Sequence, residues 1–321
     1  MTYRLRGVAA TCQNALMKHN LAAGWAIAAL LLPAAAFAQT FSFERTVPVT
    51  AAITRIEVTT DNGSVRVSAG EADHIVVNGT VKLRRGGFVL PVEAPELAKA
   101  VADKPPISAD GATVFLRQPA DRVTREATFV SYDVRVPARL MAQVTTTSGA
   151  ISIGAVAGAV AIKTSSGAID LAGVKGDITI SSSSSGIKAT DLAGALKVDN
   201  TSGRIEATFN GGGGASLKTS SGEIWLTGLH GETAITTQSS KVTLQGSPAA
   251  PWRVTTGSGA IAMKAGADAS FNLDATSETS DVKASGLGVT GTVKGRLEAP
   301  VGKGGPVVTL RSHSGQVRIE R

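Results

Sequence analysis

A short phrase of small polar residues, glycine and an aliphatic residue returns throughout the second half of this chain. Two clear copies are residues 165–169 (SSGAI) and 201–205 (TSGRI). The first four copies align at positions 149, 167, 185 and 203, a step of 18 residues, and later copies drift to 18–21. A fixed internal period of this kind is typical of solenoid proteins, in which each repeat stacks on the one before it.

Each repeat contains two stretches in which aliphatic residues alternate with polar ones. Ile169 and Leu171 follow the phrase directly, and Ile178 and Ile180 follow a second glycine, Gly176, nine residues after the first. Alternation with a period of two, rich in Ile and Val and bounded by Gly and Ser, predicts short strands separated by turns. We expect the glycine of the phrase to sit in a turn that needs positive φ.

One such repeat cannot fold alone, because its few aliphatic side chains do not offset the entropy lost in ordering 18 residues. Stacking lets every strand pair above and below and closes an apolar interior. The sequence therefore predicts an all-β protein, a single-stranded parallel β-solenoid with rungs of about 18 residues and an irregular N-terminal cap. A hairpin-rich β-sandwich is the alternative, but sandwiches seldom repeat a phrase at a fixed period.

The N-terminus has the order of segments that directs export. A basic leader precedes an apolar run over residues 21–35, and residues 36–38 (AFA) form a cleavage site. The run is shorter than the ~20 residues needed to span a bilayer, so we expect residues 1–38 to be a signal peptide that is removed. The one cysteine, Cys12, lies in this segment, so the mature chain would form no disulfide.

We divide the remaining chain into an N-terminal β-rich capping region, residues 39–144, and a β-solenoid repeat region, residues 145–321. The cap should contain strands over 74–83 and 129–136 and a short helix over 95–103, where Pro95 starts the helix and Pro105 follows its end. The glycine-rich stretch 286–305 lacks the phrase, so a distorted rung or a loop is expected there before a closing strand over 316–320.

Composition argues against a nucleic-acid partner. Three of the 32 basic residues but none of the 25 acidic ones precede Gln39, which leaves 29 basic and 25 acidic residues, a net charge of +4. Aromatic residues make up only 4% of the chain. A protein that binds nucleic acid usually concentrates basic residues and stacks aromatic ones on bases, so we expect no nucleic acid among its partners.

No group of residues has the pattern of a catalytic or metal site. His74, His230 and His313 are more than 80 residues apart and lack neighbours at zinc-ligand spacing. The many serines lack the base and the oxyanion hole that a nucleophile needs, and we expect them to satisfy turns in stacked polar ladders. Glu206 and Glu223, from neighbouring repeats, are the one carboxylate pair that could act on a glycan. We therefore expect no enzyme activity, no metal and no cofactor.

Three elements of the sequence resemble the putative adhesin family of exported bacterial proteins. They are the phrase T-[ST]-S-G-x-I-x-[IVL], the segment 61–67 (DNGSVRV) and the segment 134–140 (VRVPARL). The resemblance covers roughly residues 40–321 and implies a β-strand-repeat domain of unknown function, with no established catalytic residues to carry over. Residues 84–128 depart from the family pattern as an insertion.

The prediction for function is a non-catalytic exported β-solenoid, an adhesin-like binding or scaffold protein of the cell envelope, periplasmic or secreted. Its partner would be a cell-envelope glycan or a surface protein, no transmembrane segment remains after cleavage, and the oligomeric state is open. A carbohydrate-active β-helix enzyme and a self-assembling structural envelope protein remain alternatives. The candidate surface contacts are the outward-facing charged residues Asp170, Lys188, Arg204, Glu206 and Glu223.

Overall fold

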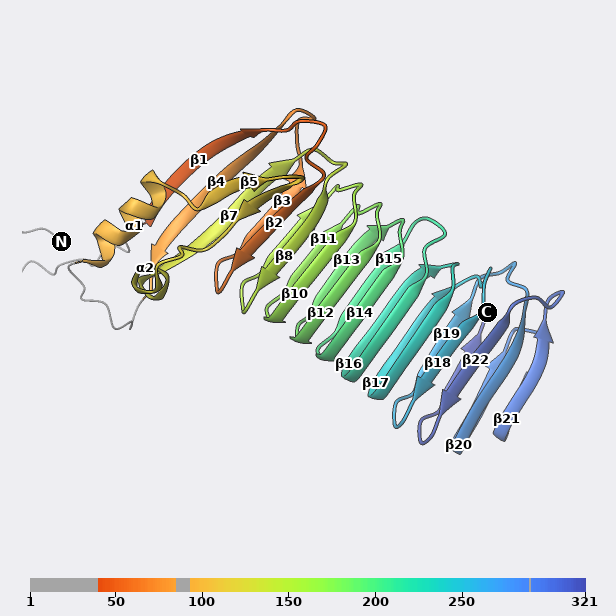
Figure 1. Ribbon diagram of the computed structural model, residues 1–321. Coiled ribbons are helices and arrows are strands. Elements are labelled where there is room, and N and C mark those ends of the chain that lie inside the picture. Colours follow the sequence, from red (N-terminus) through yellow and green to blue (C-terminus); the bar gives the residue numbers. More distant parts are fainter. Residues whose placement is uncertain (1–39, 85–92, 289) are drawn as a thin grey trace, which may run out of the picture. The chain divides into compact units, whose positions relative to one another are not determined.

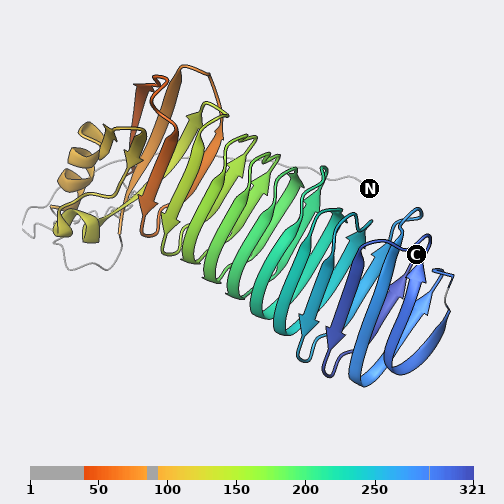
Figure 2. The same cartoon turned by 45° about the vertical axis from the view of Figure 1, so that its right-hand side comes forward.

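A computed structural model describes residues 40–84, 93–288 and 290–321. These residues fold into a stack of strands, mostly parallel, with two short helices at one end (Figures 1 and 2). The all-β fold with a many-stranded parallel sheet agrees with the prediction from the repeat. The predicted signal peptide, residues 1–38, lies outside the described residues. Among those described, no helix is both long and apolar enough to span a membrane.

The middle of the stack consists of rungs, where each rung is one turn of chain that contributes a strand to each of two layers. In the first layer the parallel strands are β8 (Met141–Thr146), β10 (Val160–Ser166), β12 (Ile178–Ser184) and β14 (Leu196–Ser202). The second layer has β9 (Ile151–Gly154), β11 (Ile169–Ala172), β13 (Ile187–Leu192) and β15 (Ile205–Phe209). Paired residues in this part of the stack are 18 apart, except for Leu192 and Phe209, where the register shifts by one residue.

Three long strands take part in both layers. These are β16 (Ala215–Leu229), β17 (Thr233–Gly246) and β20 (Phe271–Ser285). The strands β18 (Trp252–Thr256) and β19 (Ile261–Ala265) form the rung after β17. Because the long strands continue from one layer into the other, the 23 strands make up one hydrogen-bonded sheet.

The interior between the layers is a set of aliphatic files that run along the stack. One file is in direct register from strand to strand and is almost completely buried: Ile151, Ile169, Ile187, Ile205 and Ile224. Burial of each such side chain contributes roughly 1.5–3 kcal/mol. In this file neighbouring rungs present the same residue type in register, so each isoleucine stacks on the one before it.

A file of polar side chains, buried except for the half-buried Ser182, lines the corner where the first layer turns into the second. Its members are in register through the whole stack: Thr60, Thr146, Thr164, Ser182, Asn200, Thr219, Thr237, Thr256, Ser312 and Ser277. The Thr164 hydroxyl donates to the Ser166 carbonyl at 2.8 Å, and the Thr219 hydroxyl to the Ser221 carbonyl at 3.1 Å. The serines and threonines of the phrase therefore satisfy the turn backbone, as the sequence analysis predicts.

Glycine is required in the phrase for two different reasons, depending on the rung. Gly203 has φ of +117°, which only glycine adopts easily. Gly259 has no positive φ, but a Cβ there would come within 1.6 Å of the Ser240 carbonyl oxygen of the rung beneath. Ser240 and Ser185 occupy the aligned place in two rungs and are fully buried. The prediction of positive φ for the whole set is thus wrong at positions such as Gly259, where close stacking is the constraint.

At the N-terminal end, β2 (Arg55–Thr60) and β3 (Val65–Ala69) form a rung next to β8 and β9. Beyond this rung, β6 (Thr113–Leu116) pairs with β2, and β7 (Thr128–Val136) pairs with β3. Antiparallel strands β4 (His74–Leu83) and β1 (Thr40–Pro48) extend the sheet from β7, and β5 (Ile107–Asp110) forms a hairpin with β6.

Two helices lie at this end of the stack (Figure 2). Helix α1 (Ala94–Asp103) contacts β1, β4 and β7 and buries Ala98 and Val101. It lies where the sequence predicts a helix over residues 95–103. Helix α2 (Arg122–Ala127), which the sequence analysis does not predict, is capped by Asp121, whose carboxylate accepts from the Thr124 amide at 2.8 Å.

The C-terminal end departs from the order of the sequence. The rung made of β22 (Val307–Ser312) and β23 (Val317–Glu320) lies between the β18–β19 rung and β20, and pairs in parallel with both. The chain therefore skips one rung when it builds β20 and returns to fill the gap. The predicted closing strand is an interior strand of the stack.

The expectation of a distorted rung or a loop over residues 286–305 is wrong. Most of this segment is β21 (Gly291–Val301), an antiparallel strand that pairs with β20 on both sides of an irregularity between Ser277 and Asp281. Arg296 on β21 binds Asp274 on β20 with Nε 2.9 Å from Oδ1, and this hydrogen bond lowers the pKa of the Asp274 carboxyl. Local periodicity could not reveal β21, because its side chains are mostly exposed and carry no inward aliphatic face.

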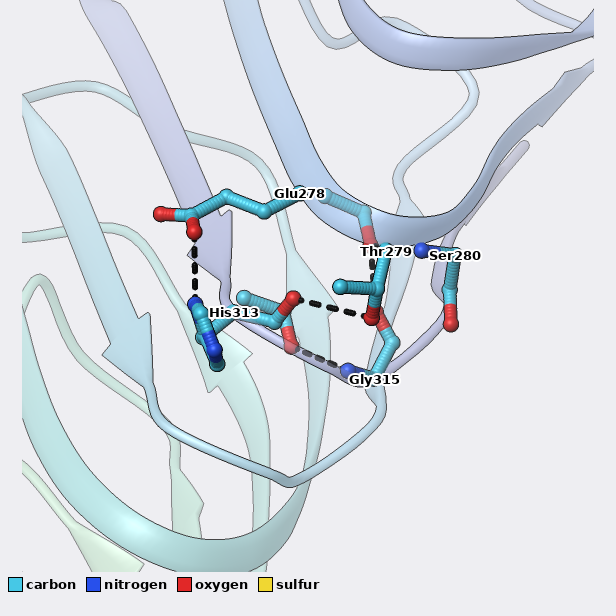
Figure 3. A network of polar contacts seen from close by, with 7 residues as sticks. Glu278, Thr279, Ser280, His313 and Gly315 are labelled. Carbon is cyan, nitrogen blue, oxygen red and sulfur yellow. Dashed lines mark hydrogen bonds and ion pairs between the residues drawn. The ribbon is translucent and has the colours of Figure 1, made fainter.

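Polar contacts join the returning rung to β20 at the corner (Figure 3). The His313 Nδ1 atom and the Glu278 Oε2 atom, 35 residues apart in sequence, are 2.6 Å apart. The Thr279 hydroxyl donates to the His313 carbonyl at 3.2 Å, and the Ser280 hydroxyl donates to the Ser314 carbonyl at 3.0 Å. These bonds hold the corner of the inserted rung in register with that of β20.

We expect Ile205→Ala to lower the free energy of unfolding by about 2–5 kcal/mol, because it opens a cavity in a file that packs on both sides. Glu206→Ala, one residue along and directed outward, should change it by no more than about 0.5 kcal/mol. Equilibrium urea unfolding measures both. Equal losses for the two variants would contradict the inward and outward assignment.

Removal of residues 306–321 should expose the edges of β18, β19 and β20, since the deleted rung pairs with all three. Amide hydrogen exchange is expected to speed up over residues 252–285 and to stay unchanged over residues 160–209. Deletion of Arg321 alone is the matched control. Unchanged protection of β18 and β19 in the longer truncation would mean that the last rung is not inserted between them.

Candidate functional site

The outer surface of the second layer carries one column of side chains that runs along the stack. Because residues alternate between the two faces of a strand, the residue after each isoleucine of the buried file points outward. The same holds for the residues after Val65 and Tyr132, which are in register with Ile151. Register places these residues next to each other in the order Asp133, Arg66, Ser152, Asp170, Lys188, Glu206 and Trp225. We refer to these seven residues as the outer column.

Three of the predicted surface contacts are successive members of the outer column. Asp170 on β11 is the direct partner of Lys188 on β13, and Lys188 is the direct partner of Glu206 on β15. Neighbouring strands are ~4.8 Å apart, so charges of opposite sign follow each other at that spacing. The structure thus brings together residues that are 18 apart in sequence.

The other two predicted contacts, Arg204 and Glu223, lie beside the column at the corner of the rungs. The Arg204 Nη2 atom is 2.7 Å from Glu223 Oε2, and the Lys241 Nζ atom of the next rung is 3.8 Å from Glu223 Oε1. The Arg204 and Lys241 side chains are mostly exposed, whereas that of Glu223 is 31% exposed. Glu223 therefore neutralises cations from the rungs on both sides.

The carboxylate pair considered for glycan hydrolysis is not formed. Glu206 is in register with Trp225 rather than with Glu223, and Glu223 is engaged by Arg204 and Lys241. A glycosidase needs two carboxyl groups that face each other across one sugar bond, one of them protonated.

A cleft of about 540 Å³ lies at the N-terminal end of the outer column. Its charged wall consists of Arg66, Asp133 and Asp170, and Asn78 and Thr80 of β4 contribute polar groups. The Arg66 Nη1 atom is 3.9 Å from Asp133 Oδ2, and both side chains are more than half exposed. The cleft is therefore polar, open and able to offer both hydrogen-bond donors and acceptors to a ligand.

The one phenol in the lining of the cleft is not available for proton transfer. Tyr132 is 2% exposed, and its hydroxyl donates to the Arg117 carbonyl. Burial raises the pKa of Tyr132 well above its usual range. The phenol stays protonated near neutral pH and has a structural part in the cleft.

Trp225, which the sequence analysis did not select, lies at the C-terminal end of the outer column. It is 48% exposed although its neighbours in sequence, Ile224 and Leu226, are fully buried. Alternation with a period of two identifies it as outward-directed, but the predicted surface contacts are all charged residues. A large aromatic side chain held in the open on a regular sheet is a common feature of binding surfaces.

The histidines do not form a metal site. His74 Nδ1 is 2.6 Å from Asp73 Oδ1, His313 pairs with Glu278, and His230 Nδ1 is 3.1 Å from the Ser247 carbonyl. Over the three described ranges, no three His, Cys, Asp or Glu residues converge as metal ligands would. Each histidine thus has a local polar partner at the surface.

Comparison with known proteins finds a family model that matches part of the chain. The Toastrack DUF4097 family model matches residues 213–320. Over this segment the chain is similar to that family. The resemblance to the putative adhesin family is thereby confirmed for this segment. The Toastrack segment includes Glu223, Trp225 and the inserted C-terminal rung, whereas Asp170, Lys188 and Glu206 precede it.

Among solved structures, a putative cell adhesion protein from Clostridium sporogenes is 11% identical, over 87% of this chain and 99% of that chain, with a TM-score of 0.20. A putative adhesin from Bacteroides fragilis is also 11% identical, over 87% of this chain and 96% of that chain, with a TM-score of 0.34. No significant match was found among curated proteins.

We expect Glu223→Gln to lower the free energy of unfolding by less than about 1 kcal/mol, since exposed ion pairs contribute little in water. The difference should shrink further at high salt, which screens the attraction of Arg204 and Lys241. Glu126→Gln, which breaks the exposed Arg122–Glu126 pair on α2, is the matched control. A loss above about 2 kcal/mol would show that the Glu223 network is essential to the corner.

Proposed function

We propose that this protein is an exported, non-catalytic β-solenoid of the cell envelope, which binds a glycan or a surface protein along the outer column. In this proposal the rungs of about 18 residues form a rigid platform, and residues 39–144 cap one end of it. Export rests on the signal-peptide pattern of residues 1–38 and would take the protein to the periplasm or the medium. The similarity of part of the chain to the Toastrack family supports an adhesin-like role.

The observation that carries the proposal is the arrangement of the outer column. Asp170, Lys188 and Glu206 are fixed side by side on consecutive strands, at one end of a cleft and with Trp225 at the other end. Every backbone that holds them is paired on both sides within the sheet. A surface held in this way loses little freedom when a ligand binds, which favours recognition.

Self-assembly by edge pairing is less well supported. The strand at the C-terminal edge, β21, carries Lys294, Arg296 and Pro300. Charged side chains and proline on an edge strand oppose pairing with another chain. Arg296 is already engaged with Asp274 and Glu298 within the same chain. These features of β21 therefore disfavour its pairing with a strand of another chain.

Binding to the cell envelope should depend on the second layer. We expect the full chain to sediment with isolated envelope fractions, and the charge swap Lys188→Glu with Glu206→Lys to weaken this binding at least tenfold. The matched control is Asp199→Lys with Lys218→Asp, which swaps a pair that is likewise in register, exposed and of opposite sign, but on the first layer. Both double variants keep the net charge.

Three outcomes are informative. Failure of the unaltered chain to sediment with peptidoglycan and with membrane fractions would contradict the proposed function. Loss of binding only in the first-layer swap would place the ligand on the other face. Release of soluble sugar from the envelope fraction during incubation would instead favour a carbohydrate-active enzyme.

A further inference from the structure

We propose that Trp225 and the hollow beside it form a subsite that stacks one pyranose ring of a glycan chain. The inference rests on the proposed binding function and narrows its ligand to a carbohydrate. The subsite occupies the outer surface of the second layer where β16, β17, β19 and β23 lie side by side.

The shape of the hollow follows from which residues stand next to Trp225. The partner of Trp225 on β17 is Thr243, and the partner of Thr243 on β19 is Ala262. These are small side chains on the two strands beside a large indole, so the surface drops from Trp225 to its neighbours. The result is a hollow of about 150 Å³, with Trp225, Thr243 and Ala262 in its lining.

Polar groups surround the hollow. Gln245, Lys264, Arg318 and Glu320 also line it. Arg318 donates to Glu320, with Nη2 3.0 Å and Nε 3.2 Å from Oε2, so this pair is held in place on β23. Gln245 and Lys264 are exposed and in register with each other on β17 and β19. The rim thus offers an amide, an ammonium, a guanidinium and a carboxylate.

This combination fits the chemistry of a sugar ring. A pyranose has an apolar face of C–H groups and a periphery of hydroxyls that both donate and accept hydrogen bonds. An indole supplies a broad, rigid surface for the apolar face at low cost in conformational entropy. The rim groups can satisfy the hydroxyls, which would otherwise lose their hydrogen bonds to water on binding.

The surroundings of Trp225 favour a glycan over a protein partner. Within the described residues the large exposed hydrophobic side chains are Val123, Trp225, Val293 and Val307, and the three valines lie on α2, β21 and β22. A stable protein interface buries ~800 Å² of surface on each partner, with a desolvated apolar centre. Trp225 alone, surrounded by polar side chains, does not provide such an apolar centre.

The size of the hollow indicates part of a polymer rather than a free small molecule. Pockets that enclose a whole ligand usually measure ~300–1,000 Å³, and this hollow is about 150 Å³. It takes one ring while the rest of the chain lies over the flat sheet. The outer column continues from Trp225 to Glu206 and Lys188, where neighbouring sugars of the same glycan can form hydrogen bonds.

The test is a titration of the full chain with three hexasaccharides: cellohexaose, chitohexaose and hexagalacturonic acid. We expect at least one to bind, seen by calorimetry and by a blue shift in tryptophan emission. Subtraction of the Trp225→Ala spectrum isolates the signal of Trp225 from that of the buried Trp252. Trp225→Ala should weaken binding at least tenfold, and Trp225→Tyr, which keeps a ring, should weaken it less.

Arg253→Ala, an exposed residue of the first layer in β18, is the matched control and should leave the affinity unchanged. Circular dichroism checks that each variant is folded, and if the alanine variant does not fold, Trp225→Tyr and Gln245→Ala carry the comparison. Equal affinity of folded Trp225→Ala, or no binding of any hexasaccharide up to millimolar concentration, would overturn the subsite.

The envelope sedimentation assay distinguishes failure of the sugar subsite at Trp225 from failure of the proposed binding function. If no hexasaccharide binds but Trp225→Ala still sediments with envelope fractions like the unaltered chain, the sugar subsite is wrong and the binding function stands. If the unaltered chain binds neither hexasaccharides nor envelope fractions, both are wrong.

Discussion

Register between successive strands is the constraint on which the rest of the structure depends. A slip of one residue in a strand would move its aliphatic side chains to the outside. The polar file at the corner opposes such a slip, because most of its side chains form a hydrogen bond with a backbone group of their own turn. Thr164 and Thr219 make the same bond two residues ahead. The hydrogen bonds of the polar file thereby fix the register of the strands that carry Ile169 and Ile224, so that both side chains point into the core.

The same constraint determines what the outer surface can present. Once Ile205 and Ile224 are committed to the interior, Glu206 and Trp225 must point outward and must be neighbours. An exposed residue on this face is therefore placed by a buried one, and its spacing from the next is that of the strands. Substitutions at outward positions change the free energy of unfolding little. The residues that contact a ligand can therefore vary while the fold stays the same.

Sequence patterns predicted what is repeated and missed what is not. Files such as Ile151 to Ile205 follow from a spacing of 18, and helix α1 from its flanking prolines. The Arg204–Glu223 contact could not be derived from alternation alone, since it depends on side-chain reach across a corner. The outward direction of Trp225 follows from alternation with the buried Ile224 and Leu226, although it was not among the predicted contacts. The insertion of β22 and β23 had no local signal, because their inward residues, Val308 and Val317, fit any rung.

Both ends of the stack share one solution to the problem of exposed strand edges. At the N-terminal end, the rung formed by β2 and β3 has β6 and β7 on one side and β8 and β9 on the other. At the C-terminal end, the rung formed by β22 and β23 has β18 and β19 on one side and β20 on the other. The strands β2, β3, β22 and β23 are therefore paired on both sides. Antiparallel strands, β1 and β5 at one end and β21 at the other, take the edge positions instead. The last rung and the strands that enclose it all lie within residues 213–320, the segment that is similar to the Toastrack family.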